Sequence, residues 1–321
     1  MAPSATYDDD PVSLIGAGAA LEAISDAIDN VNVIKGKAAS STTKSNLKFD
    51  AESQFDTTKD KTAFRLYEDA CDRVKSFYAE QHAKQTVAYN LAARQRFHSS
   101  ARQRPELTVW EAMEKLNTLV DESDPDTQLG QIQHLLQSAE AIRRDGKPRW
   151  MQLTGLIHDL GKLMLFFDGA QGQWDVVGDT FPVGCKFDER CIYPDTFREN
   201  PDYGHEVYGT EMGVYGEKCG MENLIMSWGH DEYLYLVVKD QSTLPREALA
   251  MIRFHSFYPW HKEGAYSRFM GEGDEILLNA VRAFNPYDLY SKSDGVLDVE
   301  ELKPYYLELI DEFFPGKKIR W

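Results

Sequence analysis

Four histidines and two aspartates are the residues most able to do chemistry, because they lie among apolar or aromatic neighbours. The six residues are His134, His158, Asp159, His230, His255 and Asp288. A lone histidine on a helix is more often a packed residue than a ligand, so none of them identifies a site by itself. Together they offer nitrogen and oxygen donors that suit iron, manganese or zinc. Helical scaffolds commonly hold two such ions on inward-facing side chains, so the set predicts a dinuclear metal site.

Asp159 is the most informative of these residues. It lies in the segment Leu156-Ile157-His158-Asp159-Leu160-Gly161-Lys162, where apolar residues flank it on both sides. A buried carboxylate needs a neutralising partner, and a metal ion beside His158 would supply one. Lys162 follows one turn later on the same helix face. It has two readings, a cation that stabilises an anionic oxygen of a substrate and a surface lysine whose stem covers apolar residues.

The cysteines give no support to a thiolate metal site. There are four, at 71, 185, 191 and 219, and none forms a CxxC pair. Without a secretory signal, we read them as reduced thiols of a cytoplasmic protein.

Apolar periodicity predicts that helices position the candidate ligands. The expected helices cover 108–120, 129–143, 150–167, 222–238, 246–257, 274–284 and 299–314. Proline, glycine and aspartate punctuate the segment between Gly169 and Tyr203, which we expect to be a long irregular loop that could include a small hairpin. The predicted fold class is mainly α, a single helical bundle.

Composition divides the chain into two regions. Residues 1–60 are poor in aromatic residues and contain one isolated apolar patch, Leu21 to Ile28, so we expect a flexible, disordered tail. Residues 61–321 form one domain in this interpretation, because no linker interrupts their dense apolar pattern.

The charge balance narrows the range of partners. With 35 basic and 52 acidic residues the net charge is 35 − 52 = −17, which repels nucleic acid and anionic membranes. Apolar runs are too short to span a bilayer. We expect a monomer.

The motifs resemble a known family. His134, then His158-Asp159, then a distant Asp288 resemble the HD-domain superfamily, most of whose members hydrolyse phosphate esters. Longer stretches resemble the myo-inositol oxygenase family more specifically, from about Phe64 to Trp321. They are Leu119-Val120 with Asp121-Glu122-Ser123-Asp124-Pro125-Asp126, the Leu156–Lys162 segment, Val177-Gly178-Asp179-Thr180-Phe181-Pro182-Val183-Gly184-Cys185, Ser227-Trp228-Gly229-His230-Asp231-Glu232-Tyr233, and Ile252-Arg253-Phe254-His255-Ser256-Phe257-Tyr258-Pro259-Trp260-His261.

The resemblance implies a role for each matching residue. His134, His158 and Asp288 would hold one iron ion, His230 and His255 the other, and Asp159 would bridge them. Lys162 and Asp159 would be catalytic. Substrate would be bound by Arg65, Asp121, Glu122, Ser123, Lys162, Gly178, Asp179, His255 and Ser256. The implied reaction, a step of inositol catabolism, uses an Fe(II)/Fe(III) pair and O2 to cleave myo-inositol to D-glucuronate and water.

Two other functions remain open at this point. One is a metal-dependent phosphohydrolase of the HD type, which would share four of the ligands. Phosphate sites usually gather several basic residues, whereas only Lys162 and Arg253 lie near the candidate ligands. The other is a helical binding module that a metal merely stabilises.

Overall fold

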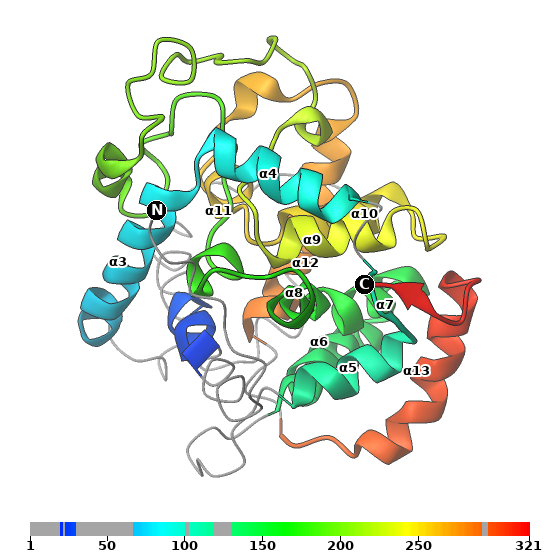
Figure 1. Ribbon diagram of the computed structural model, residues 1–321. Helices are drawn as coiled ribbons and strands as arrows, with labels where there is room; N and C mark the ends of the chain where they lie inside the picture. The colour runs from blue at the N-terminus through cyan, green and yellow to red at the C-terminus, as the bar shows by residue number, and fades with distance from the viewer. Residues whose placement is uncertain (1–19, 22, 30–66, 100–102, 119–129, 291–294) are drawn as a thin grey trace.

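The computed structural model is built mainly from helices packed around a buried centre, which confirms the predicted fold class (Figure 1). It describes residues 20–21, 23–29, 67–99, 103–118, 130–290 and 295–321. The α-helices are α3 (Tyr67–Lys84), α4 (Val87–His98), α5 (Val109–Asn117), α6 (Gln131–Arg144), α7 (Arg149–Ile157), α8 (Met164–Phe167), α9 (His230–Val238), α10 (Arg246–Phe254), α11 (Tyr258–His261), α12 (Asp274–Tyr290) and α13 (Val299–Phe313). The 3-10 turns are η1 (Leu160–Leu163), η2 (Gln173–Asp175), η3 (Pro194–Glu199), η4 (Met221–Asn223) and η5 (Ser267–Phe269).

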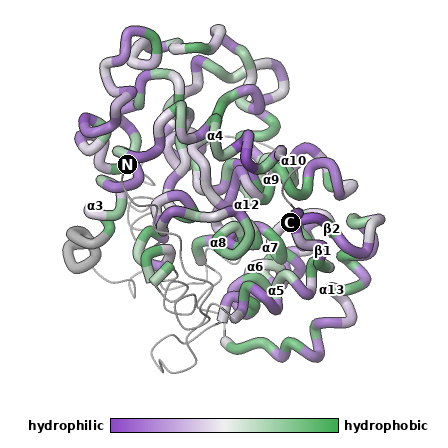
Figure 2. Tube along the Cα trace, in the orientation of Figure 1, coloured by the Kyte–Doolittle hydropathy of each residue, from purple (hydrophilic) through white to green (hydrophobic). Residues whose placement is uncertain are grey.

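The central helices pack through their apolar faces. α6 runs along α7, and α10 packs against both α9 and α12. Figure 2 shows hydrophobic and hydrophilic residues alternating along α5, α6 and α13, as expected for helices with one buried face. At the start of α5, the hydroxyl of Thr108 accepts from the amide of Glu111 at 3.1 Å, and the Glu111 carboxylate accepts from the amide of Thr108 at 2.8 Å. This capping box fixes where the helix begins.

A short antiparallel pair closes one side of the bundle. β1 (Glu106–Leu107) pairs with β2 (Ile319–Arg320), with Leu107 opposite Ile319. The terminal Trp321 is buried, and its indole nitrogen donates to the carbonyl of Leu107 at 3.3 Å. The end of the chain is thereby attached to the segment that leads into α5.

The single helix predicted over 150–167 is wrong in one important respect. α7 ends at Ile157, and a 3-10 turn, η1, begins at Leu160, so His158 and Asp159 lie at a break. The turn after the break approaches α9 closely, because a Cβ at Gly161 would lie 2.0 Å from the carbonyl oxygen of His230. Gly161 therefore allows η1 to touch the start of α9.

The long segment before α9 is irregular, as predicted, but its hairpin is not formed. Within residues 169–203, all of which are described, there are 3-10 turns and one isolated bridge residue, Pro182, which pairs with Met226. Helix α9 also begins later than predicted, at His230. The amide of His230 donates to the carbonyl of Val176 at 2.8 Å, so the irregular segment positions this histidine.

One helix lies within the predicted tail. Residues 20–29, apart from the undescribed residue 22, form a helix that we call the 20–29 helix. Its Leu21, Ile24 and Ile28 are at most 4% exposed and join the main core. The spacing of these three residues places them on one helix face, which explains why an isolated apolar patch folds. The rest of the predicted tail lies outside the described residues, and the domain boundary near residue 60 stays a prediction.

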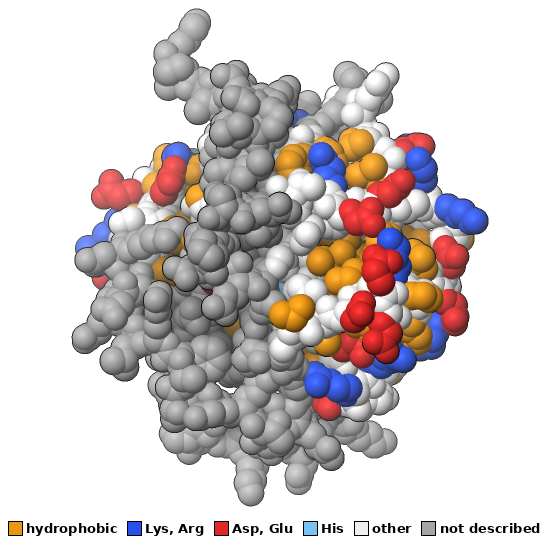
Figure 3. All heavy atoms as spheres, turned by 90° about the horizontal axis from the view of Figure 1, so that it is seen from below, with side chains coloured by type: hydrophobic (Ala, Val, Ile, Leu, Met, Phe, Trp, Pro, Cys, Tyr) orange, Lys and Arg blue, Asp and Glu red, His pale blue; other side chains and the backbone are white. Residues whose placement is uncertain are grey.

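The described surface carries charges of both signs. On the described part of the face in Figure 3, acidic and basic side chains are interspersed with hydrophobic ones. Among the helices that are described, none combines the length and apolar character needed to cross a bilayer.

Gly161 provides a test of this packing. We expect Gly161→Ala to push η1 away from α9 and to lower the free energy of unfolding by about 2 kcal/mol or more, because the added methyl group meets backbone atoms. Gly216→Ala is the control, since a Cβ there has no neighbour within 4 Å. Urea unfolding compares the two variants, and equal midpoints would contradict the close approach.

His82 provides a test of pH dependence. Its ring stacks on Phe197 with centroids 3.7 Å apart, and burial lowers its pKa to about 3. The unfolded chain takes up this proton near pH 6.5 and the folded chain does not, so stability falls as the pH drops from 6.5 toward 3. Between pH 6.5 and 5 this contributes a loss of about 2 kcal/mol. In urea titrations we expect the free energy of unfolding of His82→Phe to fall less over that interval than that of the unmodified protein. A variant of the exposed His205 should lose as much as the unmodified protein.

Candidate metal centre

Breaks and ends of helices bring all six candidate ligands together. His134 comes from α6, Asp288 from α12, and the pair His158-Asp159 from the break between α7 and η1. His230 is the first residue of α9, and His255 directly follows α10. All six residues are at most 7% exposed.

The first group of donor atoms comes from His134, His158 and Asp288 and lies beside one oxygen of Asp159. His158 Nε2 lies 3.1 Å from Asp288 Oδ1, and His134 Nε2 lies 3.6 Å from the same oxygen. His134 Nε2 is also 3.5 Å from Asp159 Oδ2. Two ligand atoms bound at right angles to one ion at about 2.1 Å would be about 3 Å apart, so this spacing fits a shared ion.

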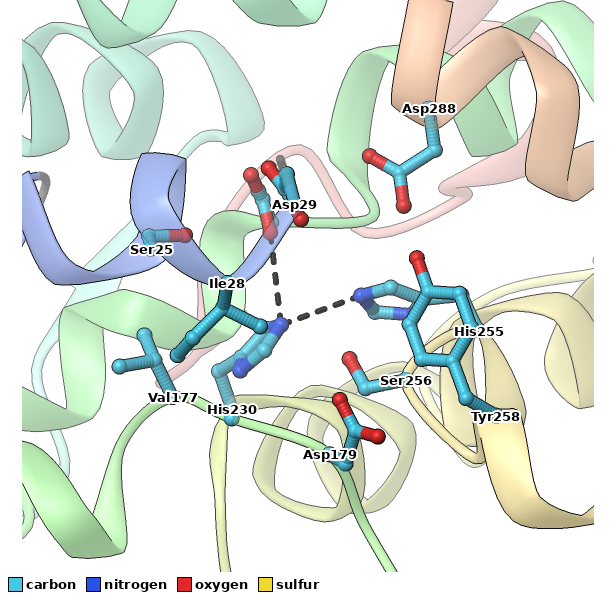
Figure 4. Close-up of a pocket in the computed structure, with 12 residues that line it drawn as sticks. Ser25, Ile28, Asp29, Val177, Asp179, His230, His255, Ser256, Tyr258 and Asp288 are labelled. Carbon is cyan, nitrogen blue, oxygen red and sulfur yellow. Dashed lines mark hydrogen bonds and ion pairs between the residues drawn. The ribbon is translucent and has the colours of Figure 1, made fainter. Parts of the chain in front are cut away.

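The second group faces the other oxygen of the same carboxylate. His230 Nε2 lies 3.4 Å from Asp159 Oδ1 and 3.1 Å from His255 Nε2, and a dashed line in Figure 4 marks the contact with His255. Asp159 thus belongs to both groups of three residues that could hold an ion. A carboxylate with one oxygen toward each group has the geometry of a bridge.

Hydrogen bonds behind the rings orient the donors. The Nδ1 atom of His158 lies 2.9 Å from the carbonyl of Gly155, and that of His230 lies 2.7 Å from the carbonyl of Val176. A carbonyl accepts only, so each Nδ1 donates and each Nε2 presents a lone pair to the centre.

His255 is oriented by a carboxylate. Its Nδ1 lies 2.8 Å from Asp231 Oδ1, which also accepts from the hydroxyl of Ser256 at 3.1 Å. In the pair His230-Asp231, the aspartate therefore orients His255 and not its neighbour His230.

Neighbouring protein groups, rather than solvent, balance the charges of the buried centre. Burial raises the pKa of Asp159, yet the Lys162 ammonium and the imidazoles of His158 and His230 outweigh it and hold that pKa well below the usual range. For His255, burial lowers the pKa and the carboxylates of Asp231, Asp288 and Asp159 raise it, giving about 10. The Nε2 atoms of His230 and His255 lie 3.1 Å apart, a distance that suits an N–H···N hydrogen bond and also two ligands of one ion. The residues present therefore fit a pair of metal ions.

A small polar cavity adjoins these groups (Figure 4). Of the predicted substrate residues, Gly178, Asp179, His255 and Ser256 line it. Lys162 is 2% exposed rather than a surface residue, and its Nζ lies 3.0 Å from Asp159 Oδ2. The other four, which are Arg65, Asp121, Glu122 and Ser123, lie outside the described residues.

Several cavity residues escaped the sequence interpretation. Tyr258 and the 20–29 helix residues Ser25, Ile28 and Asp29 line the cavity. Tyr78, buried in α3, donates to Asp179 Oδ1 at 2.8 Å and accepts from the amide of Asp179 at 3.1 Å. The apolar spacing of Leu21, Ile24 and Ile28 was the available signal for the helix, but it says nothing about where that helix packs.

Some helical bundles hold two metal ions between inward-facing nitrogen and oxygen donors that share a carboxylate. The arrangement here is of that class. Comparison with known proteins identifies the particular family. The family described as "Myo-inositol oxygenase" matches residues 71–321.

Named relatives agree with that match. The chain is 49% identical to "Inositol oxygenase" of Dictyostelium discoideum over 272 residues, 83% of this chain and 92% of the relative. It is 48% identical to "Inositol oxygenase 1" of Arabidopsis thaliana over 264 residues, 80% and 84% of the two chains. It is 46% identical to "Inositol oxygenase" of Danio rerio over 263 residues, 80% and 93% of the two chains. The chain belongs to the myo-inositol oxygenase family, and its enzyme class is that of an oxygenase. The resemblance inferred from the motifs is confirmed.

The bridging position of Asp159 predicts unequal effects of ligand substitutions. After loading with Fe(II) and desalting, we expect His230→Ala to retain about one ion per chain and Asp159→Ala to retain almost none, because the second variant removes a donor from both groups. The exposed His205→Ala is the control and should bind as the unmodified protein does. Metal analysis and far-ultraviolet circular dichroism measure binding and folding. A folded Asp159→Ala that still holds two ions would contradict the bridge.

Proposed function

We propose that the protein cleaves the ring of myo-inositol with O2, in a four-electron oxidation that yields D-glucuronate and water. The observation that carries this proposal is the convergence of six nitrogen and oxygen donors on a shared carboxylate beside a polar cavity, in a chain of this family. The cavity residues suit a polyol, whose hydroxyls must exchange hydrogen bonds with water for hydrogen bonds with the protein.

The proposed metal is a mixed-valent Fe(II)/Fe(III) pair. His134, His158 and Asp288 would hold one ion, His230 and His255 the other, with Asp159 between them. When bound, the iron pair would supply the Lewis acidity and the electron exchange that O2 reduction requires. The geometry of Asp159 supports this assignment, because its two oxygens face separate donor groups.

Lys162 is the proposed stabiliser of negative charge on the substrate. Its buried ammonium lies next to Asp159, whose charge the metal ions would already neutralise. The ammonium would then stabilise a hydroxyl oxygen of the ring that becomes anionic, and a charge acts strongly in a site that excludes water.

The remaining proposed contacts are to hydroxyl groups. Asp179, Ser256 and the backbone of Gly178 lie along the cavity wall, and Tyr78 orients Asp179. His255 would combine metal binding with a place in the same wall. Roles for Arg65 and for residues 121–123 stay predictions.

The phosphohydrolase alternative is not favoured. Asp159, Asp179 and Asp288 line the described part of the cavity, and such a surface repels phosphate. Arg253, which the sequence placed near the ligands, is held by Glu232 at 2.6 Å.

A monomeric state and a cytoplasmic location are also proposed. The location is supported by the chemistry of the described cysteines, since Cys185 and Cys191 are free and burial raises the pKa of each thiol to about 12. Such thiols are inert in a reducing compartment.

Oxygen consumption tests the reaction directly. The iron-loaded protein should consume one O2 for each glucuronate formed, and it should form none under argon. Mössbauer spectroscopy with and without myo-inositol tests for a coupled iron pair. Glucuronate formed without O2, or phosphate released from nucleotides instead, would contradict the proposal.

Lys162→Met tests the role of the ammonium separately. We expect kcat/KM to fall by roughly 10²–10³-fold with iron content unchanged, because the variant keeps the length of the side chain and loses its charge. Lys186→Met is the control, since Lys186 is exposed and paired with Glu211. Loss of iron from Lys162→Met would show instead that the ammonium serves to balance Asp159.

A further inference from the structure

The 20–29 helix reaches the candidate metal centre although it lies before the part of the chain that defines the family. The family match begins at residue 71, whereas Ser25, Ile28 and Asp29 line the cavity together with His230 and others. Figure 4 shows these three residues projecting from the helix toward the cavity that His230, His255 and Ser256 border. An element outside the family match therefore forms one wall of the proposed substrate site.

Ser25 contacts the residue proposed to act on the substrate. The Nζ atom of Lys162 donates to Ser25 Oγ at 3.3 Å and to Asp159 Oδ2 at 3.0 Å. The hydroxyl of Ser25 thus stands where the ammonium is proposed to meet a hydroxyl oxygen of the ring. Asp29 and Tyr258 also line the cavity, and the charge of Asp29 is among the causes, after burial and Asp288, that raise the pKa of Tyr258.

The space that remains is too small for a cyclic hexol. With the helix in place the cavity volume is about 20 Å³. One water molecule needs about 10–15 Å³ on this measure, so the cavity admits one or two waters. In this arrangement the 20–29 helix therefore lies in space that a six-hydroxyl ring would need.

We propose that the 20–29 helix is an internal competitor of the substrate, which must leave the pocket before myo-inositol can bind. The inference rests on the proposed function. Leu21, Ile24 and Ile28 hold the helix in place by burying one apolar face, and Ser25 offers Lys162 a hydroxyl in place of the substrate's. The substrate then binds only the open fraction of molecules, so the apparent KM is the intrinsic KM divided by that fraction.

Ile24 provides a substitution that releases the helix without touching the cavity. Ile24 is 2% exposed and is not among the residues that line the cavity, so Ile24→Glu should undock the helix by placing a charge in the core. Asp26→Glu puts the same side chain on the exposed side of the helix and is the matched control.

For the full-length, iron-loaded chain, we expect Ile24→Glu to lower KM for myo-inositol on the order of tenfold with kcat unchanged, as for an open form that is about a tenth of the population. Asp26→Glu should leave both constants as they are. An unchanged or raised KM in Ile24→Glu, with iron content preserved, would overturn the proposal and would make the helix an ordinary wall of the site.

Hydrogen exchange of the unmodified protein gives a second reading that does not depend on a variant. Under argon, saturating myo-inositol should accelerate exchange of the backbone amides of residues 20–29. Slower or unaltered exchange would contradict competition, since a lid that closes over bound substrate becomes more protected. If the unmodified protein and Ile24→Glu both lack O2 uptake dependent on myo-inositol, the proposed substrate fails, and the competitor proposal fails with it.

Discussion

The buried carboxylate of Asp159 is the group on which the arrangement of the core depends. A carboxylate only 6% exposed must be compensated, and here each of its oxygens faces a separate group of imidazoles while Lys162 lies 3.0 Å away. Three helices begin or end at this point. His158 and His255 directly follow α7 and α10, and His230 begins α9. The rest of each helix is held by packing away from the centre. The helix ends therefore place these rings at defined positions.

A second buried charge cluster keeps two of those helix ends in register. Glu232 in α9 binds Arg253 in α10 at 2.6 Å and Arg94 in α4 at 3.1 Å. Burial raises the pKa of Glu232, but the two guanidinium groups lower it more. Glu232 and Arg253 each stand two residues from a histidine of the second donor group. The ion cluster therefore sets the distance between His230 and His255 independently of a bound cation, which is how a metal site becomes preorganised.

Much of the fold could be predicted from apolar periodicity, because helices such as 109–117 and 299–313 bury one face and expose the other. The ligand set could be predicted because a single metal site explains why imidazoles and carboxylates lie among apolar residues. The break at His158 could not be predicted. The turn that follows it is packed through Gly161 against the backbone of His230, which lies 69 residues further along the chain. Likewise, no local pattern shows that Val176 orients His230, or that Ser25 and Ile28 line the cavity beside the centre.

The polarity of the cavity accounts for a neutral polyol better than for an anion. Carboxylates accept hydrogen bonds, so the wall formed by Asp179 requires donors on the ligand. A hydroxyl group donates and accepts, whereas a phosphate at neutral pH mainly accepts and carries charge of the same sign. Tyr78 strengthens this preference because its hydroxyl and the backbone amide fix the orientation of Asp179. Lys162 is the cation near this wall that can favour an anionic oxygen, and it lies beside the centre where the ring hydroxyl is proposed to lose its proton.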